Sequence, residues 1–432
     1  PMNQEKLHYF FQNFDLAHSC QTKWENYDIG YSESCAIQIA THDFLNPHTH
    51  VSNIAKGLWK KKEIPFVLNA NNARAIIEKK ENGKIIINFD IVGAGWYLMS
   101  GEQERQVSTR DKYGRFTYEQ SIQHKLKITT LPLVNYYFDI LREAMEWSKG
   151  KKIETKRVFT GTITHDIDEV LSGWKHRIRI SLEKKQYSKA VLDGLSHFFK
   201  PFFPWKNLRE LAEFNATKKV NSTFFFLAKN NQVDSIKNAD YSLSHPYLKQ
   251  ELDFLKKSKH EIGVHGSYRT HDNPEELVAD RNKISPKAIC NRFHFLQFDV
   301  NKTPRTLDSY ELRVDSTLGF QEYIGFRNSI CTPFLLFDFD NNRSFNVLEV
   351  PLNIMDCTLE YDHYMGLPPE KALIEIIKLG QEIKKFNGNI CVNWHNTYYS
   401  EYQKKEWKKM YEQLIDWLIN EKCEFKTVRE LL

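Results

Sequence analysis

The spacing of hydrophobic and polar positions changes near residue 150. Before that point, short apolar runs such as Lys84–Phe89 are separated by polar loops, and a helical pattern starts at Leu131. The polar segment Ser148–Lys156 then predicts a linker between domains. We therefore expect a smaller α+β domain of unknown role over residues 1–150 and a second domain over residues 157–432.

Beyond the linker, strand-like and helix-like segments alternate along the chain. Strands are predicted over 158–164, 222–227, 261–265, 288–295, 346–350 and 389–394. Helices are predicted over 180–199, 208–215, 247–257, 369–385 and 404–420; Pro274 opens another, and Pro201 and Pro204 end the first. This alternation is typical of βαβ units and predicts a parallel sheet or barrel. In a (β/α) barrel the chemistry gathers at the carboxyl ends of the strands.

Composition and charge narrow the class of protein. The 432 residues are 41% hydrophobic and 27% charged, which is ordinary for a globular protein. The formal net charge of +5 is small for this length and forms no long basic block, so we expect no nucleic-acid partner. We find no apolar run long enough to span a bilayer and no basic segment followed by an apolar one at the start, so neither a membrane span nor a signal peptide is expected.

The cysteines favour a reducing compartment. There are seven, an odd number, and none forms a Cys-x-x-Cys pair. Several lie in apolar segments, as Cys391 does. We therefore expect reduced, buried thiols in a cytoplasmic protein.

Two carboxylates follow the first strand of the second domain. The apolar run that starts at Gly161 ends in Asp166 and Asp168, which fall on the same face of a strand because side chains alternate. Like charges so placed repel each other unless a cation or a donor lies between them. The pair is either a strand-end turn, where aspartate is common, or one metal ligand and one general base.

Other strand ends carry imidazoles. His265 ends one strand, His294 ends the next, and His271 lies six residues after His265 in a loop. Imidazole and carboxylate ligands around zinc, with one position left open for water, are a common hydrolytic arrangement. His294 or His271 is the candidate third ligand, although a lone histidine is more often structural. His395 follows the last strand and is a candidate acid or base, or a strand cap bonded to backbone.

Charged residues within apolar segments need partners. Arg292 could pair with Asp166 and keep it ionised, or belong to a purely structural ion pair. Asp315 and Asp356 are further carboxylates at strand ends, with weaker functional signals.

The order of these motifs resembles a bacterial branch of the polysaccharide deacetylases, metal-dependent carbohydrate esterases similar to family 4, which are built on a distorted (β/α) barrel. The segments that carry the resemblance are Thr164-His-Asp-Ile-Asp168, Glu261 to Tyr268, Arg292 to Leu296, Asp315 to Phe320, Gly325-Phe-Arg327, Pro351 to Asp356 and Trp394-His-Asn396. Upstream, Gly95–Ser100 and Asp111–Phe116 resemble an accessory region that precedes the barrel in this branch.

The resemblance implies a role for each matching residue. It makes Asp166 the catalytic base, Asp168 and His265 metal ligands, His395 the general acid, Arg292 the group that orients the base and Asp315 a support for His395. The wider family has adjacent aspartates and two histidines four residues apart, whereas here Ile167 separates the aspartates and Arg269 lies four residues after His265. We therefore assign the third ligand to His294, with His271 in reserve.

The function that follows is a metal-dependent hydrolase, with Zn²⁺ as the expected ion, that removes an acetyl group from the nitrogen or oxygen of a carbohydrate. The alternative is a catalytically inactive barrel that binds glycans or serves as a scaffold in polysaccharide biosynthesis. A phosphoesterase would use similar ligands but commonly holds a second metal ion and more carboxylates.

Overall fold

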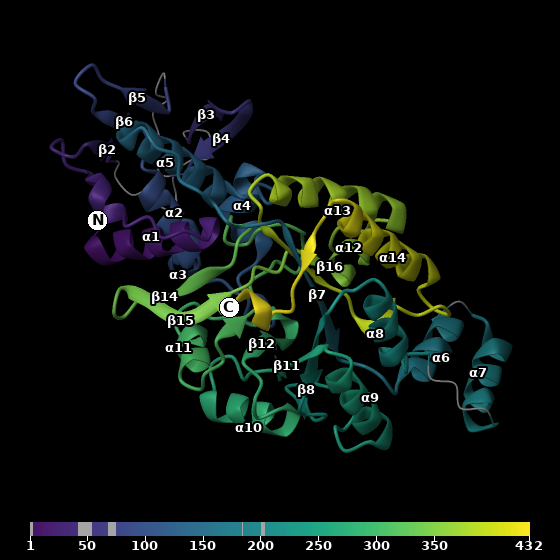
Figure 1. Cartoon of the computed structure of the whole chain (residues 1–432). Helices are drawn as coiled ribbons and strands as arrows, with labels where there is room; N and C mark the ends of the chain where they lie inside the picture. Colours follow the sequence, from purple (N-terminus) through teal and green to yellow (C-terminus); the bar gives the residue numbers. More distant parts are fainter. Residues whose placement is uncertain (1–2, 42–53, 68–74, 184, 200–203) are drawn as a thin grey trace.

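The fold is built around a ten-stranded, mostly parallel sheet (Figure 1). The computed structural model describes residues 3–41, 54–67, 75–183, 185–199 and 204–432. The strands lie in the order β14 (Phe334–Asp338), β15 (Arg343–Glu349), β13 (Val314–Asp315), β12 (Cys290–Phe293), β11 (Glu261–Gly266), β8 (Thr223–Leu227), β7 (Thr160–Ile167), β17 (Asn389–Asn393) and β16 (Ile354–Met355), and β18 (Glu424–Phe425) also pairs with β7. Neighbouring strands are parallel except for β14, which is antiparallel to β15.

The sheet curls into a half-barrel. In a flat sheet, β12 and β7 would lie about 14 Å apart, because three strand spacings of about 4.8 Å separate them. Yet Arg292 on β12 donates to Asp166 on β7 at 3.0 Å, and its other guanidinium nitrogen lies 3.7 Å from Cys391 Sγ on β17. These contacts cross the interior of the curl. The α/β class and the curled sheet of the predicted (β/α) barrel are thus confirmed. The sheet does not close, because its end strands β14 and β16 do not pair within the described residues.

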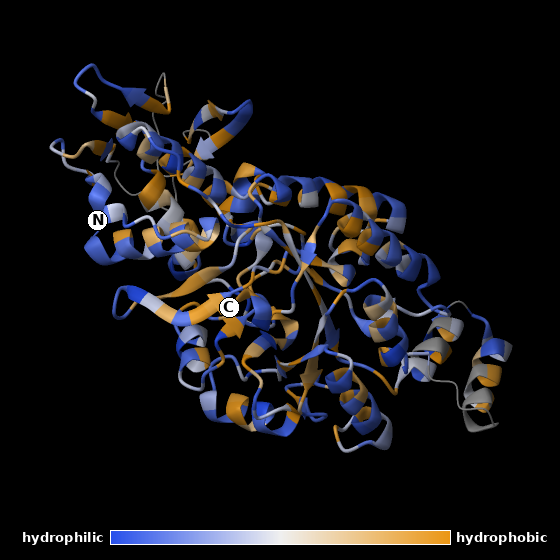
Figure 2. Cartoon of the chain, in the orientation of Figure 1, coloured by the Kyte–Doolittle hydropathy of each residue, from blue (hydrophilic) through white to orange (hydrophobic). Residues whose placement is uncertain are grey.

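Helices cover the outer face of the curl. They are α8 (Leu208–Thr217), α9 (Pro246–Lys257), α10 (Pro274–Ile284), α11 (Thr303–Asp308), α12 (Asp356–Glu360), α13 (Pro369–Lys384) and α14 (Lys405–Asn420). Helix α14 buries Trp407, Met410, Tyr411 and Leu414, which recur every three or four residues and form one stripe. Figure 2 shows hydrophobic and hydrophilic residues intermixed along these helices, as expected where only one side faces the sheet.

The described residues up to 150 form a separate, mixed sheet with its own helices. Its strands lie in the order β1 (Ile29–Gly30), β2 (Ile37–Ile39), β6 (Ile85–Ile87) and β5 (Ile77–Lys79). A hairpin of β3 (Ala55–Trp59) and β4 (Lys62–Phe66) lies beside it, with helices α1 (Gln4–His18), α2 (Ile91–Ser100), α3 (Glu102–Gln106), α4 (Ile122–Leu126) and α5 (Leu133–Lys149). We call these residues the N-terminal region.

The N-terminal region packs tightly on the curled sheet. Its buried hydrophobic residues and those of the curl form one continuous cluster. Its polar groups hold the long loop between β13 and β14, residues 316–333. Arg115 donates to Gln321 at 2.6 Å, and Glu104 forms a buried two-point ion pair with Arg327 at 2.8 and 2.7 Å. The backbone N–H of Phe326 in the same loop donates to the carbonyl of Thr129 at 2.8 Å.

Two predicted elements are wrong in detail. The single helix predicted over 180–199 is two helices, α6 (Gly173–Glu183) and α7 (Tyr187–Phe199), because Lys185 adopts a left-handed conformation (φ 55°) that a helix cannot continue. The strand predicted over 288–295 ends at Phe293, and a 3₁₀ turn follows over His294–Leu296. Pro201, expected to break the helix, lies outside the described residues. The short hairpin of β9 (Gln232–Val233) and β10 (Ile236–Lys237) was not predicted.

All seven cysteines have free thiols, four of them buried. Within the described part of the chain, we find no helix that combines the length and the apolar composition needed to cross a membrane.

Candidate metal centre

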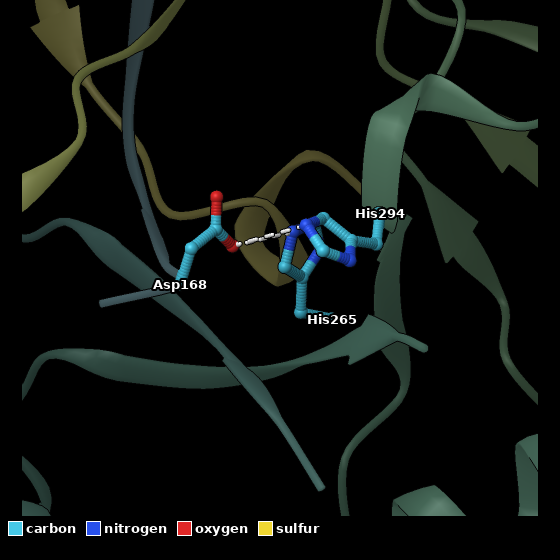
Figure 3. Close-up of side chains that lie close together, drawn as sticks. All are labelled: Asp168, His265 and His294. Atoms are coloured by element: carbon cyan, nitrogen blue, oxygen red, sulfur yellow. Dashed lines mark ion pairs between the residues drawn. The ribbon is translucent and has the colours of Figure 1, made fainter. Parts of the chain in front are cut away.

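Three side chains from the ends of three strands of the curled sheet point toward one another (Figure 3). Asp168 comes just after β7, His265 lies on β11, and His294 follows β12. Asp168 Oδ1 lies 3.2 Å from His265 Nε2 and 3.8 Å from His294 Nε2. One ligand atom from each residue lies within 4.8 Å of the others. The curl therefore brings together the three residues that we selected as metal ligands.

The donor atoms fit a divalent cation. His265 Nδ1 lies 2.7 Å from the carbonyl of Arg292, so this nitrogen carries the proton and the neutral ring turns the lone pair of Nε2 toward Asp168. Asp168 Oδ1 is buried and has no hydrogen-bond partner among the described residues. Ligands 2.0–2.2 Å from a tetrahedral ion lie roughly 3.4 Å apart, close to the two separations observed here. A cation would relieve the repulsion between these lone pairs.

Electrostatics favour the ligand forms of Asp168 and His294, whereas His265 must lose a proton to bind a cation. Although burial opposes it, the imidazoles of His294 and His265 hold the pKa of Asp168 well below its usual range, so the group is a carboxylate. Burial lowers the pKa of His294 to about 4, which leaves its imidazole neutral. Burial also opposes protonation of His265, but the nearby carboxylates of Asp166 and Asp168 raise its pKa. A cation bound beside Asp168 would replace that proton.

Asp166 is held at both oxygens. Arg292 donates to Oδ1 at 3.0 Å, and the Asn393 amide donates to Oδ2 at 2.8 Å. Burial opposes ionisation, but Arg292 outweighs it and lowers the pKa of Asp166. Arg292 is itself fixed, since it also donates to Thr164 Oγ1 and to the carbonyl of Ser316. The carboxylate is therefore ionised, oriented and 3.8 Å from His265 Nε2.

His395 faces the same site from β17. Its Nδ1 lies 2.7 Å from Asp356 Oδ1, and its Nε2 lies 3.6 Å from Asp168 Oδ2. Burial works against protonation, but Asp356 and then the two site aspartates raise the pKa of His395 to about 10. The imidazolium thus carries a proton that it can deliver into the site at Nε2.

The expected support of His395 by Asp315 is wrong. Asp315 accepts from Asn291 at 2.7 Å and from the backbone N–H of Thr317 at 3.1 Å, and it faces Glu349 on β15. Burial and the neighbouring carboxylate raise the pKa of Glu349 well above its usual range, so this pair shares a proton. Asp315 lies on β13, four strand positions from β7 on the side away from β17, whereas β16 is the direct neighbour of β17 and delivers Asp356.

His271 lies outside the cluster. Among the described residues, one group of side chains that could hold a metal ion contains His294, and no such group contains His271. Its Nδ1 is buried without a partner among the described residues, and its ring lies against Phe293.

The backbone turns directly after His294. Phe295 has a left-handed conformation (φ 59°), which cannot continue the strand, at the point where the His294 imidazole enters the site.

Sequence reasoning missed Asn393 and undervalued Asp356. Asn393 is the last residue of β17, and the strand-end rule that selected His395 also applies to it. Asp356 had been noted as a strand-end carboxylate, and its position at the end of a strand adjacent to β17 is what pairs it with His395. Neither partner could be chosen without the strand order.

A cavity of about 210 Å³ opens over the candidate metal centre. Gln321, Met355, Tyr361 and Tyr398 complete its walls. A second cavity of about 550 Å³ shares Glu169, Tyr361, Thr397 and Tyr398 with it. The site is thus a small chamber that lies beside a larger cavity.

Comparison with known proteins finds one matching family model, which covers part of the chain. Residues 3–149, about a third of the chain, match a family of unknown function, DUF7033. No curated protein matches the chain.

Several solved structures are similar at low identity. One is assigned as a polysaccharide deacetylase from Mycobacterium smegmatis (11% identity, TM-score 0.42, 64% of this chain and 90% of that chain). A second is BA3943, a CE4 family pseudoenzyme from Bacillus anthracis (10% identity, TM-score 0.33, 63% and 65%). A third is the Bc1960 peptidoglycan N-acetylglucosamine deacetylase (11% identity, TM-score 0.33, 64% and 88%).

Proposed function

We propose that the protein is a metal-dependent hydrolase that removes an acetyl group from a carbohydrate. The observation that carries the proposal is the convergence of three sets of side chains on one small cavity. These are a carboxylate with two imidazoles, a second carboxylate fixed by a guanidinium, and a protonated imidazole fixed by a third carboxylate. Together they supply the ligands, the base and the acid that metal-assisted hydrolysis needs.

Asp168, His265 and His294 would hold the ion. Two imidazoles and one carboxylate form a donor set that suits Zn²⁺ and leaves a position for substrate. When bound, a divalent ion polarises an acyl carbonyl and lowers the pKa of water beside it.

Asp166 would act as the base. Its carboxylate is ionised, and the Arg292 guanidinium and the Asn393 amide fix its orientation. It accepts a proton from the water that attacks the acyl carbon. Arg292 is a positioning residue, because it is fully buried behind the carboxylate.

His395 would act as the acid. Asp356 holds Nδ1 and keeps the ring protonated, so that Nε2 faces the cavity with a proton. This proton goes to the leaving amine or alkoxide as the bond to the acyl carbon breaks.

The size of the two cavities supports an acyl sugar as substrate. The chamber of about 210 Å³ suits a small acyl group rather than a sugar ring with its neighbours. The adjacent cavity of about 550 Å³ carries Trp205, Tyr361 and Tyr398 in its walls, and such rings stack on sugar faces. The choice of acetyl and of a carbohydrate rests on the motif resemblance. We also propose that residues 1–150 form an accessory domain to a deacetylase domain over 157–432.

The experiment compares two aspartates that are two residues apart. Purified full-length protein is loaded with Zn²⁺, its metal content is measured, and acetate release from N-acetylglucosamine oligomers and O-acetylated sugars is followed. Asp168→Asn should lose bound metal and activity together. Asp166→Asn should keep bound metal but lose activity by at least a hundredfold, because only the proton acceptor is removed.

Asp272→Asn is the matched control, because Asp272 is exposed. Melting temperatures are measured for all variants, because Asp166→Asn leaves the guanidinium of Arg292 buried without a counter-charge. Full activity in Asp166→Asn would refute the role of the base. Stoichiometric metal without turnover on any acetylated sugar, together with glycan binding, would instead favour the inactive scaffold.

A further inference from the structure

A third cavity lies at the opposite end of the curled sheet from the candidate metal centre. Its volume is about 450 Å³, and we call it the seam cavity because the N-terminal region and the curl both line it. One wall contains His18 at the end of α1 and the turn of the β3–β4 hairpin; the other contains Arg157 and Lys385. Arg157 precedes β7, whose far end carries Asp166, so the two sites lie roughly 25 Å apart at about 3.3 Å per strand residue.

The walls of the seam cavity are strongly basic. Among the described residues, six basic ones line it, namely Lys60, Lys61, Lys62, Arg142, Arg157 and Lys385, against one acidic residue, Asp139.

Three of these cations have counter-charges. Asp139 accepts from Lys60 at 2.7 Å and from Arg142 at 2.6 Å, and Lys385 pairs with Glu382 at 2.5 Å. Glu143 also lies 3.4 Å from Lys60. Lys61, Lys62 and Arg157 remain, and no carboxylate of the described residues lies within 4.0 Å of their charged groups.

Arg157 is the unusual member. Its Nη1 donates to the carbonyl of Leu16 at 3.1 Å, while its Nε is buried and has no partner among the described residues. Burial lowers the pKa of Arg157, and no carboxylate of the described residues lies close enough to offset the cost of burying its charge. An anion in the cavity would supply both the charge and the missing hydrogen-bond acceptor.

The turn of the hairpin holds two lysines in strained backbone conformations. Trp59 pairs with Lys62, so Lys60 and Lys61 form a two-residue turn with φ of 44° and 70°. Such turns favour Asn-Gly, because residues with a Cβ are strained at positive φ. Lysine therefore occupies two turn positions at the cavity where glycine would have less backbone strain.

His18 adds a group that responds to an anion. Its Nδ1 donates to the carbonyl of Phe14 at 2.8 Å. Burial, with the cations Arg142 and Arg157 nearby, lowers the pKa of His18 to about 4 although the Phe14 bond opposes the shift. A bound anion would favour the imidazolium and raise that pKa.

We propose that the seam cavity binds a small phosphorylated ligand with two or three negative charges, such as a pyrophosphate or a phosphate monoester. Three uncompensated cations match this charge better than a single carboxylate would, and Arg157 offers the planar donor set that phosphoryl oxygens accept. The volume lies within the range of small-molecule sites. Because the cations come from both walls, the ligand would fasten the N-terminal region to the curl.

The test is a calorimetric titration of the full-length chain with inorganic pyrophosphate, with ribose 5-phosphate as a monoester and with citrate as a carboxylate of similar charge. We expect at least one phosphoryl compound to bind and to raise the melting temperature, and citrate to bind at least tenfold more weakly. Arg157→Gln should weaken phosphoryl binding by at least tenfold. The pair Lys61→Gly and Lys62→Gln should do the same without harming the fold, since glycine suits the turn.

Lys259→Gly is the matched control, because this exposed lysine also has a positive φ (63°) but lies outside the cavity. Asp168→Asn should bind as tightly as the unaltered chain, which separates this site from the candidate metal centre. The proposal is overturned if neither phosphoryl compound binds, if citrate binds equally well, or if the Arg157 and hairpin variants bind like Lys259→Gly.

Discussion

The buried ion pair between Glu104 and Arg327 offers a sharp test of how the N-terminal region is attached. Both side chains are at most 2% exposed, and the guanidinium meets the carboxylate at two points. The other recorded acceptor of Arg327 is the carbonyl of Gly319, at 3.4 Å. Arg327→Met leaves the Glu104 carboxylate buried without its counter-charge, which is far more costly than losing an exposed pair.

The expected magnitude follows from burial. Breaking a buried pair from one side costs about 3–5 kcal/mol. At about 2.1 cal/mol/K per residue, the 432 residues give an unfolding entropy of roughly 0.9 kcal/mol/K if the chain unfolds in one step. Arg327→Met should therefore lower the melting temperature by roughly 3–6 °C. Replacing both partners, Glu104→Leu with Arg327→Met, should recover most of that loss, because no buried charge remains.

Calorimetry on four proteins measures this. The unaltered chain, Arg327→Met, the double variant and Glu102→Gln are compared, the last because Glu102 forms an exposed pair with Arg105 on the same short helix. Glu102→Gln should change the free energy of unfolding by less than about 1 kcal/mol. If Arg327→Met is no more harmful than Glu102→Gln, or if the double variant is the least stable of the four, the reasoning from burial fails.

Three further outcomes are expected. Asp356→Asn should lower the pKa of His395 in the metal-free chain by roughly 1–3 pH units, because it removes the carboxylate that contributes most to keeping the imidazole protonated. The NMR shifts of the imidazole measure this pKa, and an unchanged value would contradict the pairing of His395 with Asp356. Gly325→Ala should destabilise the chain by about 2 kcal/mol or more in urea unfolding, since φ is 130° and the new Cβ would lie 2.3 Å from the carbonyl oxygen of Thr129; a neutral effect would show that the loop can shift. The folded pKa of His18 (about 4) lies below the unfolded value of 6.5, so the unfolded chain binds more protons between these pH values. His18 should therefore lower the free energy of unfolding by on the order of 2–3 kcal/mol as the pH falls from 6.5 to 4. His18→Gln should flatten that part of the profile of stability against pH, and an unaltered slope would rule out this contribution.

Much of the fold was predictable because strand and helix periods differ clearly in the second half of the chain. The strand-end rule also selected Asp168, His265 and His294 before their positions were known, since parallel strands deliver their carboxyl ends to one edge. It could not choose between Asp315 and Asp356 for His395, because that choice depends on which strands are neighbours.

The seam cavity had no signal in the sequence at all. Lys61, Arg157 and Lys385 are far apart in the chain, and each alone is an ordinary surface cation. Only the packing of the two parts places them around one space. Similarly, the curl that allows Arg292 to reach Asp166 is a property of the whole sheet and not of any one strand.

The loop over residues 316–333 has a practical consequence for anyone who wishes to work with a shortened protein. Gln321 forms part of the wall over the candidate metal centre, yet its side chain is anchored by Arg115, and Phe326 is anchored by Thr129. A fragment that starts at residue 157 would therefore keep every proposed ligand but release one wall of the chamber. Failure of such a fragment to turn over substrate would say little about the intact polypeptide.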